Sequence, residues 1–151
     1  MPSPAPSSYD AIILGAGAAG LFCAGIAGQR GRKVLLIDHA DAPGKKILIS
    51  GGGRCNFTNL HVAADRFLSQ NPRFALSALK RFTQWDFIAR MDAAGIGWHE
   101  KTLGQLFCDG PATQVVAMLV KDLAAAFRHG IPPVPVHIER RRLEQEERAI
   151  D

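Results

Sequence analysis

The 151-residue sequence lacks features that would place it in several classes of protein. Its longest apolar runs unbroken by glycine are of strand length, whereas a membrane-spanning helix needs about 20 apolar residues. Residues 1–8 are rich in proline and serine, without the basic start and apolar stretch of a secretory signal. We therefore expect a disordered tail at residues 1–8, no membrane partner and a cytoplasmic protein.

Cysteine is scarce, and the three cysteines are Cys23, Cys55 and Cys108. They are far apart, and none belongs to a Cys-x-x-Cys pair or lies beside two histidines. We therefore expect neither a metal site nor a disulfide framework. Cys23 falls in a predicted helix, where a buried structural thiol is expected. Cys55 lies between Arg54 and Asn56, and a cation there could lower its pKa. A close-packed loop thiol is favoured over a redox or nucleophilic role.

The net charge of +4 and the isoelectric point near 9.3 do not by themselves indicate a nucleic-acid-binding protein. The basic residues are scattered, mixed with acids or gathered in one glycine-rich loop, and no basic helix with interleaved aromatic residues is evident. The densest charge lies at residues 139–151, where three arginines are followed by glutamates, and we expect a solvated, charged tail there. The sequence thus predicts no nucleic-acid partner.

The most informative segment that is present begins at residue 9. A largely apolar run of strand length, Tyr9 to Leu14, leads into Gly15-Ala16-Gly17-Ala18-Ala19-Gly20 and then into a stretch of small residues. This order of strand, G-x-G-x-x-G and helix is typical of a dinucleotide-binding turn. Gly15 permits the tight turn, Gly17 lets the backbone approach a pyrophosphate, and Gly20 lets the helix pack closely on the sheet. The phosphates then lie at the helix N-terminus, where free N–H groups favour an anion.

A second apolar strand, residues 33–38, ends in Asp38. A carboxylate at the end of this strand accepts hydrogen bonds from both ribose hydroxyls of an adenosine and repels a 2′-phosphate. The position of Asp38 after the glycine motif therefore predicts NAD or FAD and not NADP. A Rossmann fold that binds no ligand is the alternative.

The segment of residues 43–59 distinguishes FAD from NAD. Three successive glycines and three basic residues suit a close approach to phosphate, or to negative charge that develops on a cofactor ring. A plain NAD-dependent dehydrogenase has no such insertion after its second strand. A surface turn with solvated lysines is the alternative interpretation. The glycines are Gly51, Gly52 and Gly53, and the basic residues are Lys45, Lys46 and Arg54.

In these residues the chain resembles the bacterial NAD(P)/FAD-dependent oxidoreductases, a flavoprotein family that includes the bile-acid 7-dehydroxylation flavoprotein and aminoacetone oxidase-type enzymes. The sequence GKKILISGGGRCN of residues 44–56 carries the resemblance, and markers at residues 82–87 and 99–108 extend it over residues 9 to about 126. The resemblance implies FAD as the cofactor and NAD(P)H as an electron donor of the full-length parent. It implies that the pyrophosphate is bound by Gly15, Gly17, Ala18, Ala19 and Gly20, the ribose by Asp38, and the phosphates and flavin by Lys46, Gly51, Gly52, Gly53, Arg54, Cys55 and Asn56. It identifies no catalytic residue.

Together these patterns predict an α/β protein with a Rossmann-like FAD/NAD(P)-binding domain over residues 9–138. Parallel strands are expected at residues 10–14, 33–38 and 134–138, and the last is expected at an edge because prolines remove its hydrogen-bond donors. Residues 67–110 are expected to form a helical and hairpin insertion beside the sheet. Helices are predicted at residues 72–81, at 84–94 and from Pro111 onward with a buried apolar stripe, and a hairpin is predicted at 96–107 around Leu103-Gly104.

The length of the chain sets the functional expectation. Members of the resembled family are more than twice as long and close the flavin pocket with a later substrate domain. We therefore expect an apparently truncated, FAD-binding N-terminal portion of a flavin-dependent oxidoreductase, inactive alone, whose parent acts on a small-molecule substrate. Exposed sheet edges predict self-association. Two alternatives remain: an NAD-dependent dehydrogenase domain, and a non-catalytic remnant or interaction module.

Overall fold

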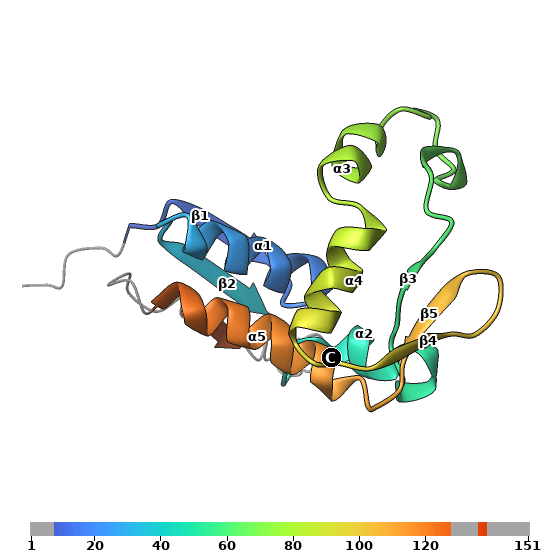
Figure 1. Ribbon diagram of the computed structural model, residues 1–151. Coiled ribbons are helices and arrows are strands. Elements are labelled where there is room, and N and C mark those ends of the chain that lie inside the picture. Colours follow the sequence, from blue (N-terminus) through green and yellow to red (C-terminus); the bar gives the residue numbers. More distant parts are fainter. Residues whose placement is uncertain (1–7, 128–135, 139–151) are drawn as a thin grey trace, which may run out of the picture. The chain divides into compact units, whose positions relative to one another are not determined.

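The computed structural model describes residues 8–127 and 136–138. The chain divides into two compact units, and Figure 1 labels most of their helices and strands. The first unit comprises residues 1–45 and 116–151 and contains a parallel sheet, and the second comprises residues 46–115 and contains an antiparallel sheet. None of the helices in the described part of the chain is both long and apolar enough to cross a membrane.

Three parallel strands form the sheet of the first unit in the order β1-β2-β6. They are β1 (Ala11–Leu14), β2 (Val34–Asp38) and β6 (Val136–Ile138). In the register of the sheet, Ala11 pairs with Val34 and Leu36 pairs with Val136. The predicted α/β fold with parallel strands in these three places is thus confirmed, and β6 lies at an edge among the described strands. Residues 134 and 135 of the last predicted strand lie outside the described residues.

Helix α1 (Ala18–Gln29) packs against this sheet through buried Leu21 and Ala24, while Leu36 of β2 is also buried. Its small residues allow a second helix, α5 (Thr113–Phe127), to approach closely. A Cβ atom built at Gly25 would lie 3.6 Å from the Cβ atom of Asp122. A methyl group would just fit here, and a side chain larger than that of alanine would push the two helices apart.

Two expectations about helix faces in the first unit need correction. Cys23 is exposed on α1, not buried, because Leu21 and Ala24 occupy the inward face of the helix. Small and apolar residues occur all round this helix, so the sequence did not show which face points inward. On α5 the predicted apolar stripe included both Leu119 and Val120. Leu119 is buried, whereas Val120 is 39% exposed, so the buried stripe is narrower than predicted.

The second unit is built on an antiparallel sheet in the order β3-β5-β4. Its elements are α2 (Lys45–Ile49), which begins at the boundary, the 3₁₀ turn η1 (Ser50–Gly53), β3 (Asn56–Asn59), the 3₁₀ turn η2 (Ala64–Arg66), α3 (Leu76–Arg81), α4 (Gln84–Ala93), β4 (Trp98–Glu100) and β5 (Gln105–Cys108). The predicted hairpin around Leu103 is confirmed by the pairing of β4 with β5. Strand β3 was not predicted, because its residues were assigned to the cofactor loop. Met91 and Leu106 are fully buried in this unit.

The helix predicted from residue 72 begins later, at Leu76. The Asn71 side chain accepts a hydrogen bond from the Arg73 backbone N–H at 3.1 Å, and the Asn71 carbonyl accepts one from the Phe74 N–H at 3.1 Å. These bonds close a local turn around Pro72. Asn71 therefore forms a turn instead of capping a helix, which is the other conformation that this residue type favours.

The capping box predicted at the start of α4 is present. The Thr83 hydroxyl accepts a hydrogen bond from the Asp86 N–H at 3.3 Å, and the Asp86 carboxylate accepts one from the Thr83 N–H at 2.6 Å. The bond from the Thr83 N–H, followed by the bond from the Thr83 hydroxyl, lowers the pKa of Asp86. The reciprocal bonds satisfy two backbone donors that a helix N-terminus otherwise leaves unpaired.

Replacing Thr83 with alanine is expected to lower the free energy of unfolding by about 1 kcal/mol, because an N-cap hydroxyl is lost. Urea denaturation followed by circular dichroism measures the change. Thr102→Ala is the matched control, since Thr102 is exposed and its hydroxyl bonds to none of the described residues. Equal stabilities of the two variants would contradict the assigned cap.

Candidate functional site

In the glycine turn of the first unit, backbone geometry explains why glycine is needed at two of the three motif positions. Gly15 has a φ of +100°, a conformation that residues with a side chain rarely adopt, and its N–H donates to the Ile37 carbonyl at 2.7 Å. A Cβ atom at Gly20 would lie 1.8 Å from the Gly15 carbonyl oxygen. The first turn of α1 can therefore approach the end of β1 only with glycine at this position.

Gly17 is different, because nothing in the local backbone requires glycine there. Its φ of −78° and ψ of −171° suit any residue, and a Cβ atom would meet no described atom within 4 Å. Gly17 is the N-cap of α1, and no described side chain caps this end of the helix. Ala18 and Ala19 are exposed here. The N-terminus of α1 thus presents backbone N–H groups beside an open space, an arrangement that suits an anion.

Asp38 lies at the same glycine turn. One carboxylate oxygen accepts a hydrogen bond from the Ala16 N–H, and the other accepts one from the Ala40 N–H at 2.8 Å. The Ala40 bond, then the Ala16 bond, lowers the pKa of Asp38, and the His39 ring 3.6 Å away adds to the effect. The carboxylate is therefore ionised at neutral pH, and it holds the turn in place in addition to its predicted role toward a ribose.

The second glycine segment is a tight turn that packs against β5. Gly51, Gly52 and Gly53 all have positive φ, at 58°, 67° and 85°. A Cβ atom at Gly51 would lie 2.6 Å from a ring atom of Phe107 and 2.9 Å from the Asn56 backbone nitrogen. Gly51 is therefore required by packing, whereas a Cβ atom at Gly52 would meet no described atom within 4 Å.

The basic residues of this segment differ in their surroundings. The Arg54 guanidinium donates to the backbone carbonyl of Asp109, and the Arg54 carbonyl accepts from the Cys108 N–H at 2.8 Å. Lys46 is exposed on α2. Asn56 is exposed at the start of β3 and pairs with Phe107. Arg54 thus holds the turn to the end of β5, and Lys46 is the freer cation.

Cys55 is 5% exposed and adopts a φ of 49°, and Cys108 is fully buried beside it. Burial raises the pKa of the Cys55 thiol, and burial together with the neighbouring Cys55 raises the pKa of Cys108 to about 11. Because Arg54 bonds to the Asp109 carbonyl, its proximity in sequence does not produce a thiolate at Cys55. The buried, protonated thiol agrees with the favoured interpretation of Cys55 as a close-packed loop thiol.

The structure brings the predicted site residues together in two sets. Gly15, Gly17, Ala18, Ala19, Gly20 and Asp38 lie in the first unit, and Lys46, Gly51, Gly52, Gly53, Arg54, Cys55 and Asn56 lie in the second. Within the first set, the bond between Ala16 and Asp38 joins the glycine turn to the acid. Within the second set, backbone bonds to β5 and to Ala112 fix the turn.

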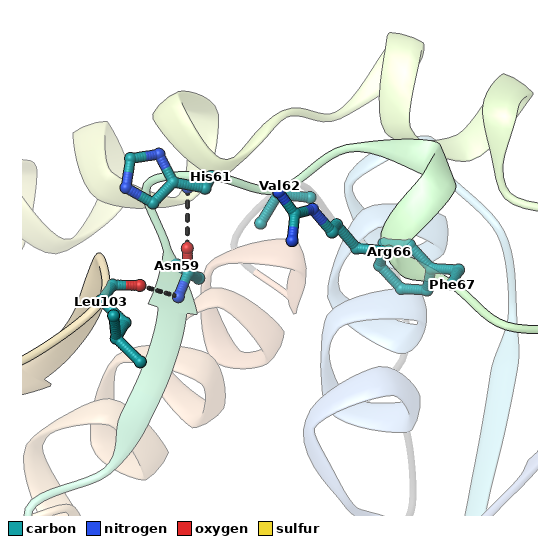
Figure 2. Close-up of a pocket in the computed structure, with 6 residues that line it drawn as sticks. All are labelled: Asn59, His61, Val62, Arg66, Phe67 and Leu103. Carbon is teal, nitrogen blue, oxygen red and sulfur yellow. Dashed lines mark hydrogen bonds between the residues drawn. The ribbon is translucent and has the colours of Figure 1, made fainter.

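Sequence reasoning missed a cavity in the second unit (Figure 2). Its volume is about 580 Å³, within the range usual for small-ligand sites. It is lined by Asn59, His61, Val62, Arg66, Phe67 and Leu103. Of the lining residues, only the pair Arg66-Phe67 carried a signal in the sequence, because an arginine precedes a phenylalanine again at residues 73–74 and 81–82.

Comparison with protein families gives a match over residues 9–131 to the HI0933-like protein Rossmann domain. The chain belongs to this family. The match confirms the resemblance inferred from residues 9 to about 126 and agrees with the parallel sheet of the first unit. The glycine turn and the second glycine segment both lie within the HI0933-like region.

Curated relatives of this HI0933-like chain include two with the same name. Ribosomal RNA dihydrouridine synthase of Escherichia coli (strain K12) is 67% identical over 114 residues, which are 76% of this chain and 28% of that protein. The protein of that name from Haemophilus influenzae is 57% identical over 108 residues, 72% of this chain and 27% of that protein. The chain therefore spans just over a quarter of the length of these relatives.

A third relative supports the resemblance to bile-acid flavoproteins. It is the 3-dehydro-bile acid delta(4,6)-reductase of Clostridium scindens, which is 40% identical over 73 residues. These residues are 46% of this HI0933-like chain and 18% of that protein.

Proposed function

We propose that this chain binds FAD and forms the cofactor-binding portion of a flavin-dependent oxidoreductase that reduces uridine in ribosomal RNA. The observation that supports this most is the bond between Asp38 and Ala16, which holds an ionised carboxylate at a glycine turn that opens a helix. This arrangement suits an adenosine diphosphate group, whose ribose needs an acceptor and whose phosphates need N–H donors.

The pyrophosphate would lie at the N-terminus of α1. Three features favour an anion there: the uncapped N–H groups in the described structure, the absence of an acidic residue in the first turn, and the positive end of the helix dipole. Gly17 provides the space, since a Cβ atom there would project where no described atom lies within 4 Å. Asp38 would accept hydrogen bonds from the ribose and repel a 2′-phosphate, which favours FAD or NAD over NADP.

Further contacts to FAD are proposed from the family resemblance. They are Lys46, Gly51, Gly52, Gly53, Arg54, Cys55 and Asn56, which comprise an exposed cation and a glycine turn with its flanking residues. The exposed ammonium group of Lys46 suits a phosphate, and the open space at Gly52 suits close approach of a ligand to the backbone. We propose the cytoplasm as the compartment and NAD(P)H as the electron donor of the whole enzyme.

The proposed substrate departs from the small molecule that the sequence predicts. The two relatives named ribosomal RNA dihydrouridine synthase favour a uridine in RNA instead. Conversion of uridine to dihydrouridine adds a hydride and a proton across one carbon–carbon double bond. Bound reduced FAD would supply the hydride, and the protein supplies binding and orientation.

Asp38→Ala is expected to weaken FAD binding by about 1.5–3 kcal/mol, the range for a hydrogen bond to a charged group, which corresponds to roughly 10- to 150-fold in Kd. Part of the lost binding free energy comes from the missing hydrogen bonds to the ribose. The rest comes from the turn, which loses the bond between Asp38 and the Ala16 N–H. Isothermal titration of the purified 151-residue chain with FAD measures the effect. Asp65→Ala removes the same charge from an exposed position in the second unit and serves as the control.

Equal FAD affinity in the two variants would contradict the assignment of Asp38. The visible absorption of flavin in the purified protein gives a second readout. A chain that shows a thermal shift with NAD and none with FAD would instead support the alternative of an NAD-dependent dehydrogenase domain.

A further inference from the structure

Two phenylalanine side chains of the second unit are exposed to solvent and are not buried in its core. Phe67 is 40% exposed and Phe74 is 55% exposed, and their ring centroids lie 6.4 Å apart with the planes at 78° to each other. The neighbouring Leu68 is 95% exposed. Single exposed apolar residues are common, but a cluster that includes two aromatic rings marks a surface for interaction.

The charge around these rings is predominantly positive. Residues 60–82 contain two arginines beside the exposed rings, Arg66 and Arg73, followed by Lys80 and Arg81, and only one carboxylate, that of Asp65. Arg66 and Arg73 are exposed, and neither guanidinium pairs with a carboxylate in the described part of the chain. An excess of free cations next to aromatic rings is complementary to a polyanion that carries flat, apolar groups.

Two hydrogen bonds drawn in Figure 2 join residues that line the cavity beside Phe67. The Asn59 side chain accepts a hydrogen bond from the His61 N–H at 2.7 Å and donates one to the Leu103 carbonyl at 2.9 Å. Leu103 has a φ of 52° and is 85% exposed, so the hairpin holds an apolar side chain outward in a conformation unfavourable for leucine. The hydrogen-bonded rim and the outward side chain of Leu103 both favour a binding surface over a simple turn.

We propose that Arg66, Phe67, Arg73 and Phe74, which we call the Arg-Phe surface, bind single-stranded RNA together with the adjacent cavity. The arginines contact phosphates, the phenylalanine rings stack on bases, and one nucleotide enters the cavity of about 580 Å³. This inference rests on the proposed function, in which the substrate is RNA. It adds the residues that recognise it, and it replaces the expectation that no nucleic acid is bound.

RNA suits this surface better than a membrane does. Insertion at a membrane interface usually uses a long amphipathic helix, whereas α3 is six residues long and begins after both exposed rings. A single strand of RNA is also a better match than a duplex, because its unstacked bases can place their faces on the exposed rings.

The test is fluorescence anisotropy with a labelled single-stranded oligouridine of about twelve nucleotides, within the range of single-strand site sizes, and the full 151-residue chain. The double variant Phe67→Leu with Phe74→Leu keeps apolar bulk but removes the aromatic faces. We expect its Kd to rise about tenfold or more, with an unchanged circular dichroism spectrum because both rings are exposed. A Kd within twofold of the unsubstituted protein, or no binding by the unsubstituted protein, would overturn the proposal.

The arginines are tested through the salt dependence of the same binding. Arg66→Ala and Arg73→Ala should each reduce the slope of log Kd against log salt concentration by about 0.7, the value for one phosphate contact on a single strand. Arg32→Ala removes the same charge from an exposed site in the first unit and should leave the slope unchanged. An equal change in all three variants would overturn the proposal, because it would show a general charge effect.

Two further measurements separate the alternatives. If the double phenylalanine variant binds RNA normally but elutes differently in gel filtration, the surface belongs to self-association and the proposal fails. FAD titration of the same variants should give unchanged affinity. If RNA binding is absent while FAD binding persists, only this inference fails. If FAD binding is absent while RNA binding persists, only the FAD assignment fails.

Discussion

Replacing Gly20 with alanine is expected to destabilise the first unit strongly. The added Cβ atom would lie 1.8 Å from the Gly15 carbonyl oxygen and 3.0 Å from its carbon, and these are backbone atoms that no side-chain rotation can move. Overpacking in a core usually costs about 1–3 kcal/mol, and here we expect about 3 kcal/mol or more because the turn itself must shift. A loss of that size is a large fraction of the usual stability of a domain.

Urea denaturation followed by far-ultraviolet circular dichroism measures this loss, and hydrogen exchange at β1 and β2 locates it. Gly17→Ala is the matched control, since it is the same substitution three residues earlier and meets no described atom within 4 Å. Its effect should not exceed about 1 kcal/mol, the difference between glycine and alanine at an N-cap. The close approach of α1 to β1 would be in doubt if both variants were equally stable.

The second large effect is expected from Gly17→Val, which should leave the fold intact and weaken FAD binding by more than about 100-fold. The backbone at Gly17 has a φ of −78° and a ψ of −171°, which valine adopts readily. The branched side chain would project where the pyrophosphate is proposed to lie. Loss of two hydrogen bonds to a charged group, at about 1.5–3 kcal/mol each, accounts for the size of the effect.

Calorimetric titration with FAD gives the affinity, and a thermal melt of the same sample shows whether the protein is folded. Gly17→Ala should lie between the unsubstituted chain and the valine variant, because a methyl group displaces the phosphates less. If the valine variant bound FAD as tightly as the unsubstituted chain, the residues from Gly15 to Gly20 could not be the phosphate site.

Much of the first unit could be predicted because its pattern is local and its glycines have backbone causes. Gly15 lies in a conformation that favours glycine, and Gly20 lies against a backbone oxygen, so the motif corresponds to a definite geometry. The position of Asp38 after a short apolar strand placed the acid at the turn, where the structure shows it bonded to Ala16. The start of α4 at Thr83 followed likewise from a capping pattern within four residues.

The remainder depends on contacts between residues distant in sequence. Strand β3 exists because it pairs with β5, and its Asn56 pairs with Phe107, a partner that no local pattern specifies. Gly51 was assigned to a loop that suits close approach to a ligand, yet Phe107 lies so close that glycine is required there for packing. The cavity near Phe67 also depends on the hairpin residue Leu103, far along the chain, so its lining could not be assembled from sequence.

The distribution of thiols has a practical consequence. Cys55 and Cys108 are buried, with raised pKa values, while Cys23 is exposed on α1. Alkylating reagents attack thiolates that solvent can reach, so the unsubstituted chain already offers one accessible labelling position and two shielded ones. A maleimide dye could therefore be attached to the helix that follows the glycine turn without any cysteine substitution, giving an optical reporter of ligand binding at that turn.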